Sequence, residues 1–316
     1  MAILANSHGS RHFRNFNVLC KVREGILLPF HLNSYPMNFI KAGNDAAGHP
    51  VEINYVDYGQ GKPVVLIHGW PLDLQSWEYQ LAELPLHGLR VVAYDRRGYG
   101  KSGKPWDGYD YDTLADDLKA VLDQLDLHNV TLVGFSMGGG EVARYMSRHQ
   151  GARVGKVVFI SSVTPYLLKT DDNPDGVDKS TFDGIIEKIG EDRPGFLATF
   201  GKQFYGVGAL SHPVSQPTLD WSQNIALQAT PRATTECAKA WSATDFRQDL
   251  KGIKVPTLFI HGGADKTVPP ENSAERAVKL VPGAELKIYE GEPHGLNVTA
   301  KDRLNTDLLE FIGVAS

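Results

Sequence analysis

The stretch TLVGFSMGGGEVARYM, residues 131–146, decides the fold of this chain. Its first five residues form a short apolar run typical of a buried strand, and the residues after the serine have the composition of a helix. Between them, Gly134-Phe135-Ser136-Met137-Gly138 matches the pattern Gly-x-Ser-x-Gly. A tight turn exposes the serine hydroxyl, and small residues two before and two after it let strand and helix pack closely. The pattern predicts Ser136 as a catalytic nucleophile.

Short apolar runs alternate with helical stretches along most of the chain. The runs are continuous rather than alternating with polar residues, which is typical of strands buried on both faces of a parallel sheet. We predict strands at residues 64–67, 91–94, 131–135, 157–160, 257–260 and 286–289. An amphipathic stripe predicts a helix over residues 111–125. The alternation predicts an α/β fold with a mostly parallel, doubly wound sheet.

Two segments depart from this rhythm. Residues 163–250 contain helical pieces separated by Pro and Gly and no buried-strand run. Because a crossover between two strands needs far fewer residues, we predict an inserted helical cap over the strand ends, with residues 37–162 and 251–316 as the core. Residues 1–36 hold four Arg or Lys against one Glu and show no periodic pattern, so we expect an N-terminal appendage. A basic docking arm is the alternative interpretation.

A nucleophilic serine requires a base, and the base requires an acid that orients it. In this fold the chain order is serine, acid, histidine. Asp265 directly follows one predicted strand and His294 follows the next, which places both at the same sheet edge as Ser136. His212 is another histidine downstream of Ser136, but it falls in the predicted cap. His261 ends a predicted strand, and we interpret it as positioning the loop that carries Asp265.

Acyl transfer also requires two N–H donors for the developing oxyanion. One is the backbone N–H of the residue after the nucleophile, Met137, and the other comes from the loop HGWP, residues 68–71, after an early strand. Pro71 has no N–H, so we predict Trp70 as the second donor.

Three phenylalanines of the predicted cap recur every four residues, which places them on one helix face: Phe196, Phe200 and Phe204. We predict that Trp70, Phe200 and Phe204 line an apolar acyl pocket. The alternative is that the phenylalanines only hold the cap to the core. Trp221 and Trp241 are expected in the core of the cap.

Composition narrows the function further. The net charge of −5 and the absence of a Lys/Arg run argue against a nucleic acid or an anionic membrane as partner. The two cysteines, Cys20 and Cys237, match neither a metal-ligand spacing nor a disulfide framework. No apolar run is long enough to span a bilayer, and the first residues do not have the pattern of a secretory signal. We therefore expect a cytoplasmic protein without a metal or an organic cofactor.

Five motifs together carry a family resemblance: HGWP (68–71), YDRRGYGKS (94–102), GFSMGGGE (134–141), HGGAD (261–265) and PHG (293–295). They resemble the α/β-hydrolases described as bacterial cofactor-free haloperoxidases, perhydrolases and aryl esterases, over about residues 37 to 312. The resemblance implies the triad Ser136, Asp265 and His294, with Trp70 and Met137 as oxyanion donors. Asp95 and Arg96 match a structural turn of the family.

The resemblance also implies the reaction. Small acyl esters would be cleaved through an acyl-enzyme, which either water or hydrogen peroxide releases, and peroxide would yield a peracid that oxidises halide. A proline after the tryptophan, here Pro71, is similar to members classed as peroxidases or perhydrolases. A homo-oligomer is also implied. Two alternatives stay open: hydrolysis of amides or lactams by the same triad, and a non-catalytic small-molecule receptor on the same fold.

Overall fold

The structure is a computed structural model that describes residues 38–314. The predicted appendage at residues 1–36, with its alternative as a docking arm, lies outside the described residues. The contacts divide the chain into two units, Met1–Met37 and Asn38–Ser316, and the described residues belong to the second. This unit contains an eight-stranded sheet in the order β1-β2-β4-β3-β5-β6-β7-β8. The strands are β1 (Asn38–Asn44), β2 (Pro50–Gly59), β3 (Lys62–Ile67), β4 (Leu89–Tyr94), β5 (Val130–Phe135), β6 (Val154–Ile160), β7 (Thr257–Gly262) and β8 (Glu285–Tyr289).

The six predicted strands correspond to β3 through β8, and all neighbours among them pair in parallel. Every residue of β5 and of β7 is buried, as expected for continuous apolar runs between two helix layers. The strands β1 and β2, which the apolar runs did not predict, form an antiparallel extension of the sheet. Exposed and buried residues alternate along most of β1, so no continuous apolar run marks it in the sequence.

Helices cover the sheet in two packed groups, α2 with α3 and α7, and α1 with α10. The predicted helix at residues 111–125 corresponds to α2, which begins after Asp110, whose side chain accepts a hydrogen bond from the N–H of Thr113. These elements confirm the predicted doubly wound α/β fold. The α-helices before β6 and after Ala243 are α1 (Glu78–Glu83), α2 (Tyr111–Gln124), α3 (Met137–Arg148), α7 (Arg247–Lys251), α8 (Ala274–Ala277), α9 (Leu296–Thr299) and α10 (Lys301–Ile312).

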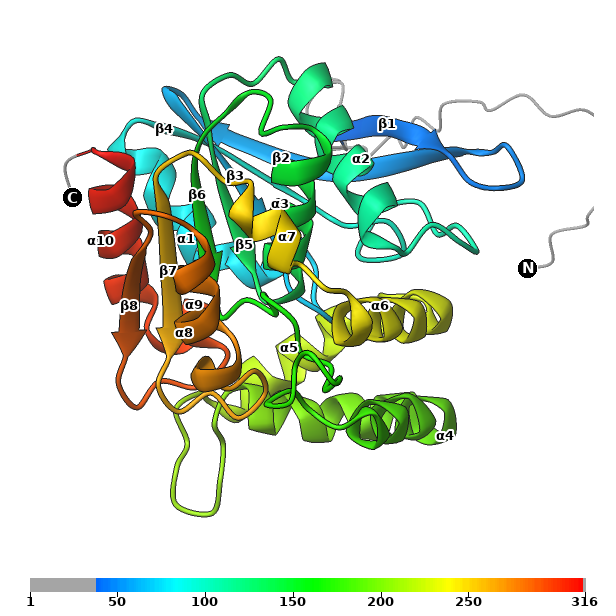
Figure 1. Cartoon of the computed structure of the whole chain (residues 1–316). Coiled ribbons are helices and arrows are strands. Elements are labelled where there is room, and N and C mark those ends of the chain that lie inside the picture. The colour runs from blue at the N-terminus through cyan, green and yellow to red at the C-terminus, as the bar shows by residue number, and fades with distance from the viewer. Residues whose placement is uncertain (1–37, 315–316) are drawn as a thin grey trace, which may run out of the picture. The chain divides into compact units, whose positions relative to one another are not determined.

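Between β6 and β7 the chain forms α4 (Lys179–Phe204), α5 (Gln216–Leu227) and α6 (Pro231–Ala243). Figure 1 shows these three helices beyond the carboxyl ends of the parallel strands, where the predicted cap is expected. A non-helical residue, Asp192, interrupts α4, two positions before Pro194, which cannot donate the next helical hydrogen bond. The division into core and cap at residues 163 and 250 stays a prediction. None of the helices in the described part of the chain is both long and apolar enough to cross a membrane.

Candidate active site

Ser136 lies at the turn between β5 and α3. Its backbone has φ of 53° and ψ of −116°, a region that non-glycine residues rarely adopt, and its N–H donates to the carbonyl of Ile160 at 2.8 Å. A Cβ at Gly134 would lie 2.5 Å from the carbonyl oxygen of Gly138, and a Cβ at Gly138 would lie 2.4 Å from that of Ile67. The two glycines of the motif therefore allow the close packing that the turn requires.

Asp265 and His294 lie on the loops after β7 and β8, and both approach Ser136. The Oγ atom of Ser136 is 2.9 Å from Nε2 of His294, and Nδ1 of the same ring is 2.6 Å from Oδ2 of Asp265. The three residues are 5%, 1% and 4% exposed, in the order Ser136, His294, Asp265. The structure thus brings the three predicted residues into one buried hydrogen-bonded chain. Such a chain allows the imidazole to take the hydroxyl proton while the carboxylate fixes its tautomer.

Asp265 is held as a carboxylate by contacts on both oxygens. Oδ1 accepts hydrogen bonds from the N–H groups of Thr267 and Val268, each at 2.8 Å. Oδ2 faces His294 and also Nε2 of His261, at 3.2 Å. Burial favours the neutral acid, but the charge of His294 and the hydrogen bonds of both histidines outweigh it and hold the pKa of Asp265 well below its usual range.

The ring of His261 is fixed by a second contact. Its Nε2 is 2.8 Å from the carbonyl oxygen of Val268, which can only accept, so Nε2 carries a proton. The other ring nitrogen, Nδ1, is buried and has no hydrogen-bond partner within the described residues. The ring therefore donates to the carbonyl of Val268 in the loop that carries Asp265, which agrees with its interpreted role in positioning that loop.

The loop at residues 68–71 follows β3 and runs directly against the serine, because β3 and β5 are neighbours in the sheet. A Cβ at Gly69 would lie 3.0 Å from Cβ of Ser136. Within the described part of the chain, the backbone N–H groups of Trp70 and Met137 donate to no other group. Both therefore keep their hydrogen-bonding capacity for a ligand at the serine, as an oxyanion hole requires.

A buried polar network holds this loop from behind. Nη2 of Arg96 donates to the carbonyl of His68 at 2.8 Å, and Nε donates to Glu141 at 2.9 Å. The N–H of Arg96 donates to Nε2 of His68, so Nδ1 carries the ring proton and faces the carbonyl of Gly69. Burial, and next the charge of Arg96, lower the pKa of His68 well below its ordinary value, so the ring stays neutral. The Asp-Arg turn of the sequence analysis thus supports the oxyanion loop.

A cavity of about 820 Å³ opens above Ser136, between the strand ends and α4. Trp70 and Phe200 line it as predicted, with their ring centroids 5.1 Å apart. Phe204, by contrast, is not among the lining residues and packs against the ring of His294 at 5.0 Å. Each step of four residues turns a helix by about 40° past a full turn, so Phe204 has rotated away from the face that Phe196 presents.

Two residues near the site, Trp241 and Glu141, have positions that the sequence did not predict. Trp241 was expected in the core of the cap, but it lines the cavity and lies 5.7 Å from the Trp70 ring. To predict the position of Trp241, one would need to know which face of α6 meets the core. Glu141 was quoted within a motif but given no role, although a carboxyl group on the buried face of a helix predicts a buried partner.

The described residues contain no cluster of three or more His, Cys, Asp or Glu side chains that could hold a metal ion. His212 is exposed in the loop between α4 and α5, outside the hydrogen-bonded chain of Ser136, His294 and Asp265. The neighbouring tryptophan of the cap, Trp221, is partly buried against the hydrophobic core.

The fold and this site define an α/β hydrolase, and the chain belongs to the α/β-hydrolase fold family, whose model matches residues 62–300. A non-heme chloroperoxidase of Kitasatospora aureofaciens is 43% identical, over 83% of this chain and 96% of its own length. A bifunctional esterase/perhydrolase of Acinetobacter calcoaceticus is 40% identical over 83% and 96%. The crystal structure of a bromoperoxidase from Bacillus anthracis, 47% identical, superposes with a TM-score of 0.84 over 87% of this chain and 99% of that one.

Proposed function

We propose that this protein is a cofactor-free serine esterase for small acyl esters, including aryl esters, that also uses hydrogen peroxide as acceptor and then forms a peracid. Ser136 is the nucleophile, His294 the general base and Asp265 the acid that orients the imidazole. The N–H groups of Trp70 and Met137 bind the oxyanion. The observation that carries this proposal is the buried chain of hydrogen bonds from Ser136 to Asp265 beneath an apolar cavity.

Acylation follows from this geometry. His294 Nε2 removes the hydroxyl proton as Ser136 Oγ attacks the acyl carbon, and the carbonyl oxygen becomes an oxyanion that the two N–H groups stabilise. Loss of one such donor typically costs about 3 kcal/mol of transition-state stabilisation. The imidazolium then protonates the leaving group. The 820 Å³ cavity has room for both halves of an aryl ester against the rings of Trp70 and Phe200.

Deacylation repeats these roles with a new nucleophile. The acceptor gives a proton to His294 Nε2 as its oxygen attacks the acyl carbon, and the proton passes to Ser136 Oγ when the ester bond breaks. Water yields the carboxylic acid and hydrogen peroxide yields the peracid. The relatives support both outcomes, since one is named an esterase/perhydrolase and another a chloroperoxidase.

The test compares the wild type with Ser136→Ala. We expect the wild type to hydrolyse p-nitrophenyl acetate, and the variant to lose activity by about 10⁴-fold or more. With hydrogen peroxide and bromide, the wild type should bleach monochlorodimedone without an added metal. Halogenation that requires a metal, or that survives Ser136→Ala, would contradict the proposed mechanism. A wild type that binds esters without turnover would instead indicate a receptor, and turnover of amides alone an amidase.

We further propose a cytoplasmic location and a homo-oligomeric state. The location is supported by Cys237, a free thiol that is fully buried in α6, and by the lack of a disulfide framework in the sequence. Fractionation of cells and light scattering of the purified protein test the two proposals. We also propose that the cap extends from residue 163 to residue 250.

A further inference from the structure

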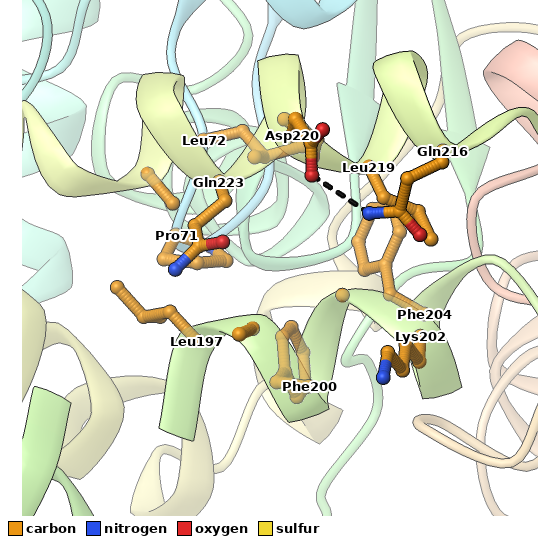
Figure 2. Close-up of a pocket in the computed structure, with 14 residues that line it drawn as sticks. Pro71, Leu72, Leu197, Phe200, Lys202, Phe204, Gln216, Leu219, Asp220 and Gln223 are labelled. Atoms are coloured by element: carbon orange, nitrogen blue, oxygen red, sulfur yellow. Dashed lines mark hydrogen bonds between the residues drawn. The ribbon is translucent and has the colours of Figure 1, made fainter. Parts of the chain in front are cut away.

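A second cavity, of about 200 Å³, lies next to the one above Ser136. Figure 2 shows it between α4, α5 and the segment that follows Trp70. Its inner part is formed by buried apolar side chains, among them Leu72 and Leu197. At its outer part, the exposed side chains of Gln216 and Asp220 are hydrogen-bonded to each other at 2.7 Å. The second cavity therefore has a polar entrance and an apolar floor.

One aromatic wall separates the two cavities. Within the described residues, Phe200 is the single residue that lines both. Its ring lies 5.1 Å from that of Trp70 on one side and 5.9 Å from that of Phe204 on the other. Phe204 lines the second cavity and packs against the ring of His294. The second cavity is thus one layer of rings away from the general base.

The reaction needs access for two very different molecules. The acyl group occupies the larger, apolar cavity, and while it is bound the acceptor must still reach the acyl carbon. An acyl group that fills the larger cavity obstructs the passage of the acceptor through that cavity. The second cavity has amide and carboxylate groups at its entrance, and it is the smaller of the two, with room for water or hydrogen peroxide.

We propose that the second cavity is the entry route for the small hydroxylic acceptor, water or hydrogen peroxide, and that rotation of the Phe200 side chain opens its wall to the acyl-enzyme. This inference rests on the proposed acyl-enzyme mechanism. The acceptor forms a bond to the acyl carbon and gives its proton to His294 Nε2. The bond from the acyl carbon to Ser136 Oγ breaks, and the proton moves to that oxygen. The products are the free enzyme and the acid or the peracid.

The test fills the second cavity without changing the first. Gly201 lines only the second cavity, and a Cβ there would meet no atom within 4 Å, so Gly201→Leu extends into open space. Gly190→Leu is the matched control, because Gly190 lies in the same helix, is equally open and lines neither cavity. Both replace a helical glycine by leucine, so both gain similar helix propensity. Leu219→Trp fills the second cavity from α5, on the opposite side.

The two half-reactions are measured separately. The burst of p-nitrophenol on mixing with p-nitrophenyl acetate gives the acylation rate, and turnover at increasing hydrogen peroxide gives the rate at which peroxide releases the acyl group. We expect Gly201→Leu and Leu219→Trp to slow release by about tenfold or more, with acylation within about twofold of the wild type. Gly190→Leu should change neither rate.

Two results would overturn the inference. Release that is unchanged in both blocking variants would mean that the acceptor enters through the cavity above Ser136. An equal loss in acylation and release would mean that the substitutions disturb the catalytic groups rather than the route. A failure of the proposed function would be seen differently, as ester turnover that survives Ser136→Ala in the same assay.

Discussion

Replacement of Asp265 by asparagine tests the site most sharply, because donors face both oxygens of this carboxylate. Two backbone N–H groups, of Thr267 and Val268, point at Oδ1, and the two imidazoles of His294 and His261 face Oδ2. An amide has one acceptor oxygen and one NH₂ group. The NH₂ group of the variant must therefore face either the backbone donors or the imidazoles.

The orientation of the amide depends on which of these donors can become an acceptor. A backbone N–H cannot become an acceptor, and two opposed donors would leave buried groups unpaired at about 1–3 kcal/mol each. An imidazole can change tautomer, so the amide oxygen should stay on the backbone and the NH₂ group should face His294. Nδ1 of His294 then accepts, its proton moves to Nε2, and that proton points at Ser136 Oγ. In this tautomer His294 cannot take the proton of Ser136.

We therefore expect Asp265→Asn to lower kcat for p-nitrophenyl acetate by about 10⁴-fold, or about 5.5 kcal/mol, with KM changed far less. The exposed Asp302 in the first turn of α10 offers a matched control, Asp302→Asn, which should leave kcat unchanged. Circular dichroism checks that both variants fold. If kcat of Asp265→Asn stayed within about tenfold of the wild type, the tautomer argument would be wrong.

Three further predictions concern the residues around the site. Glu141→Gln leaves the buried guanidinium of Arg96 without a counter-charge, so the free energy of unfolding in urea should fall by about 3 kcal/mol or more. Burial and the charge of Asp95 raise the pKa of Asp73 to about 7. Between about pH 4 and about pH 7 the folded state therefore keeps a proton that the unfolded state has lost. Because of this, the free energy of unfolding falls as the pH rises through this range. In urea unfolding, the free energy of unfolding of Asp73→Asn relative to that of the wild type should therefore rise by up to about 4 kcal/mol between these pH values. A difference between variant and wild type that is the same at both pH values would contradict this prediction. Gly138→Ala places a methyl group 2.4 Å from a carbonyl oxygen of β3, so esterase activity should fall by about tenfold or more, and an unchanged kcat would contradict the packing argument.

The sequence predicts the centre of the fold well because burial on both faces leaves an unmistakable pattern. Strands such as β5 are continuous apolar runs, and the loops that follow them carry Ser136, Asp265 and His294 to one edge of the sheet. Chain order and strand ends are enough to place these residues together. The outer strands β1 and β2 could not be found in this way, because a half-exposed strand alternates polar and apolar residues over only a few positions.

Side-chain direction is where the sequence fails. The spacing of the cap phenylalanines predicts one helix face, but it cannot say where that face stops meeting the cavity above Ser136, which Phe200 lines and Phe204 does not. The same limit applies to His261, whose closeness to Oδ2 of Asp265 depends on a ring rotation fixed by the carbonyl of Val268. Helical and strand periods locate a residue to within a face, whereas catalysis depends on individual atoms.

Pro71 of the core loop connects the predicted oxyanion donor with the second cavity. Pro71 has no N–H, so it cannot compete with Trp70 for the oxyanion, and its buried ring forms part of the wall of the second cavity. The residue at this position therefore affects two features of the site. These are the geometry of the oxyanion donor that precedes it and the proposed route of the acceptor. Phe200 of the cap lines both cavities, so it contacts the acyl pocket as well as the proposed route. Substitutions at Pro71 should consequently change both acylation and release, whereas those at Gly201 should change release alone.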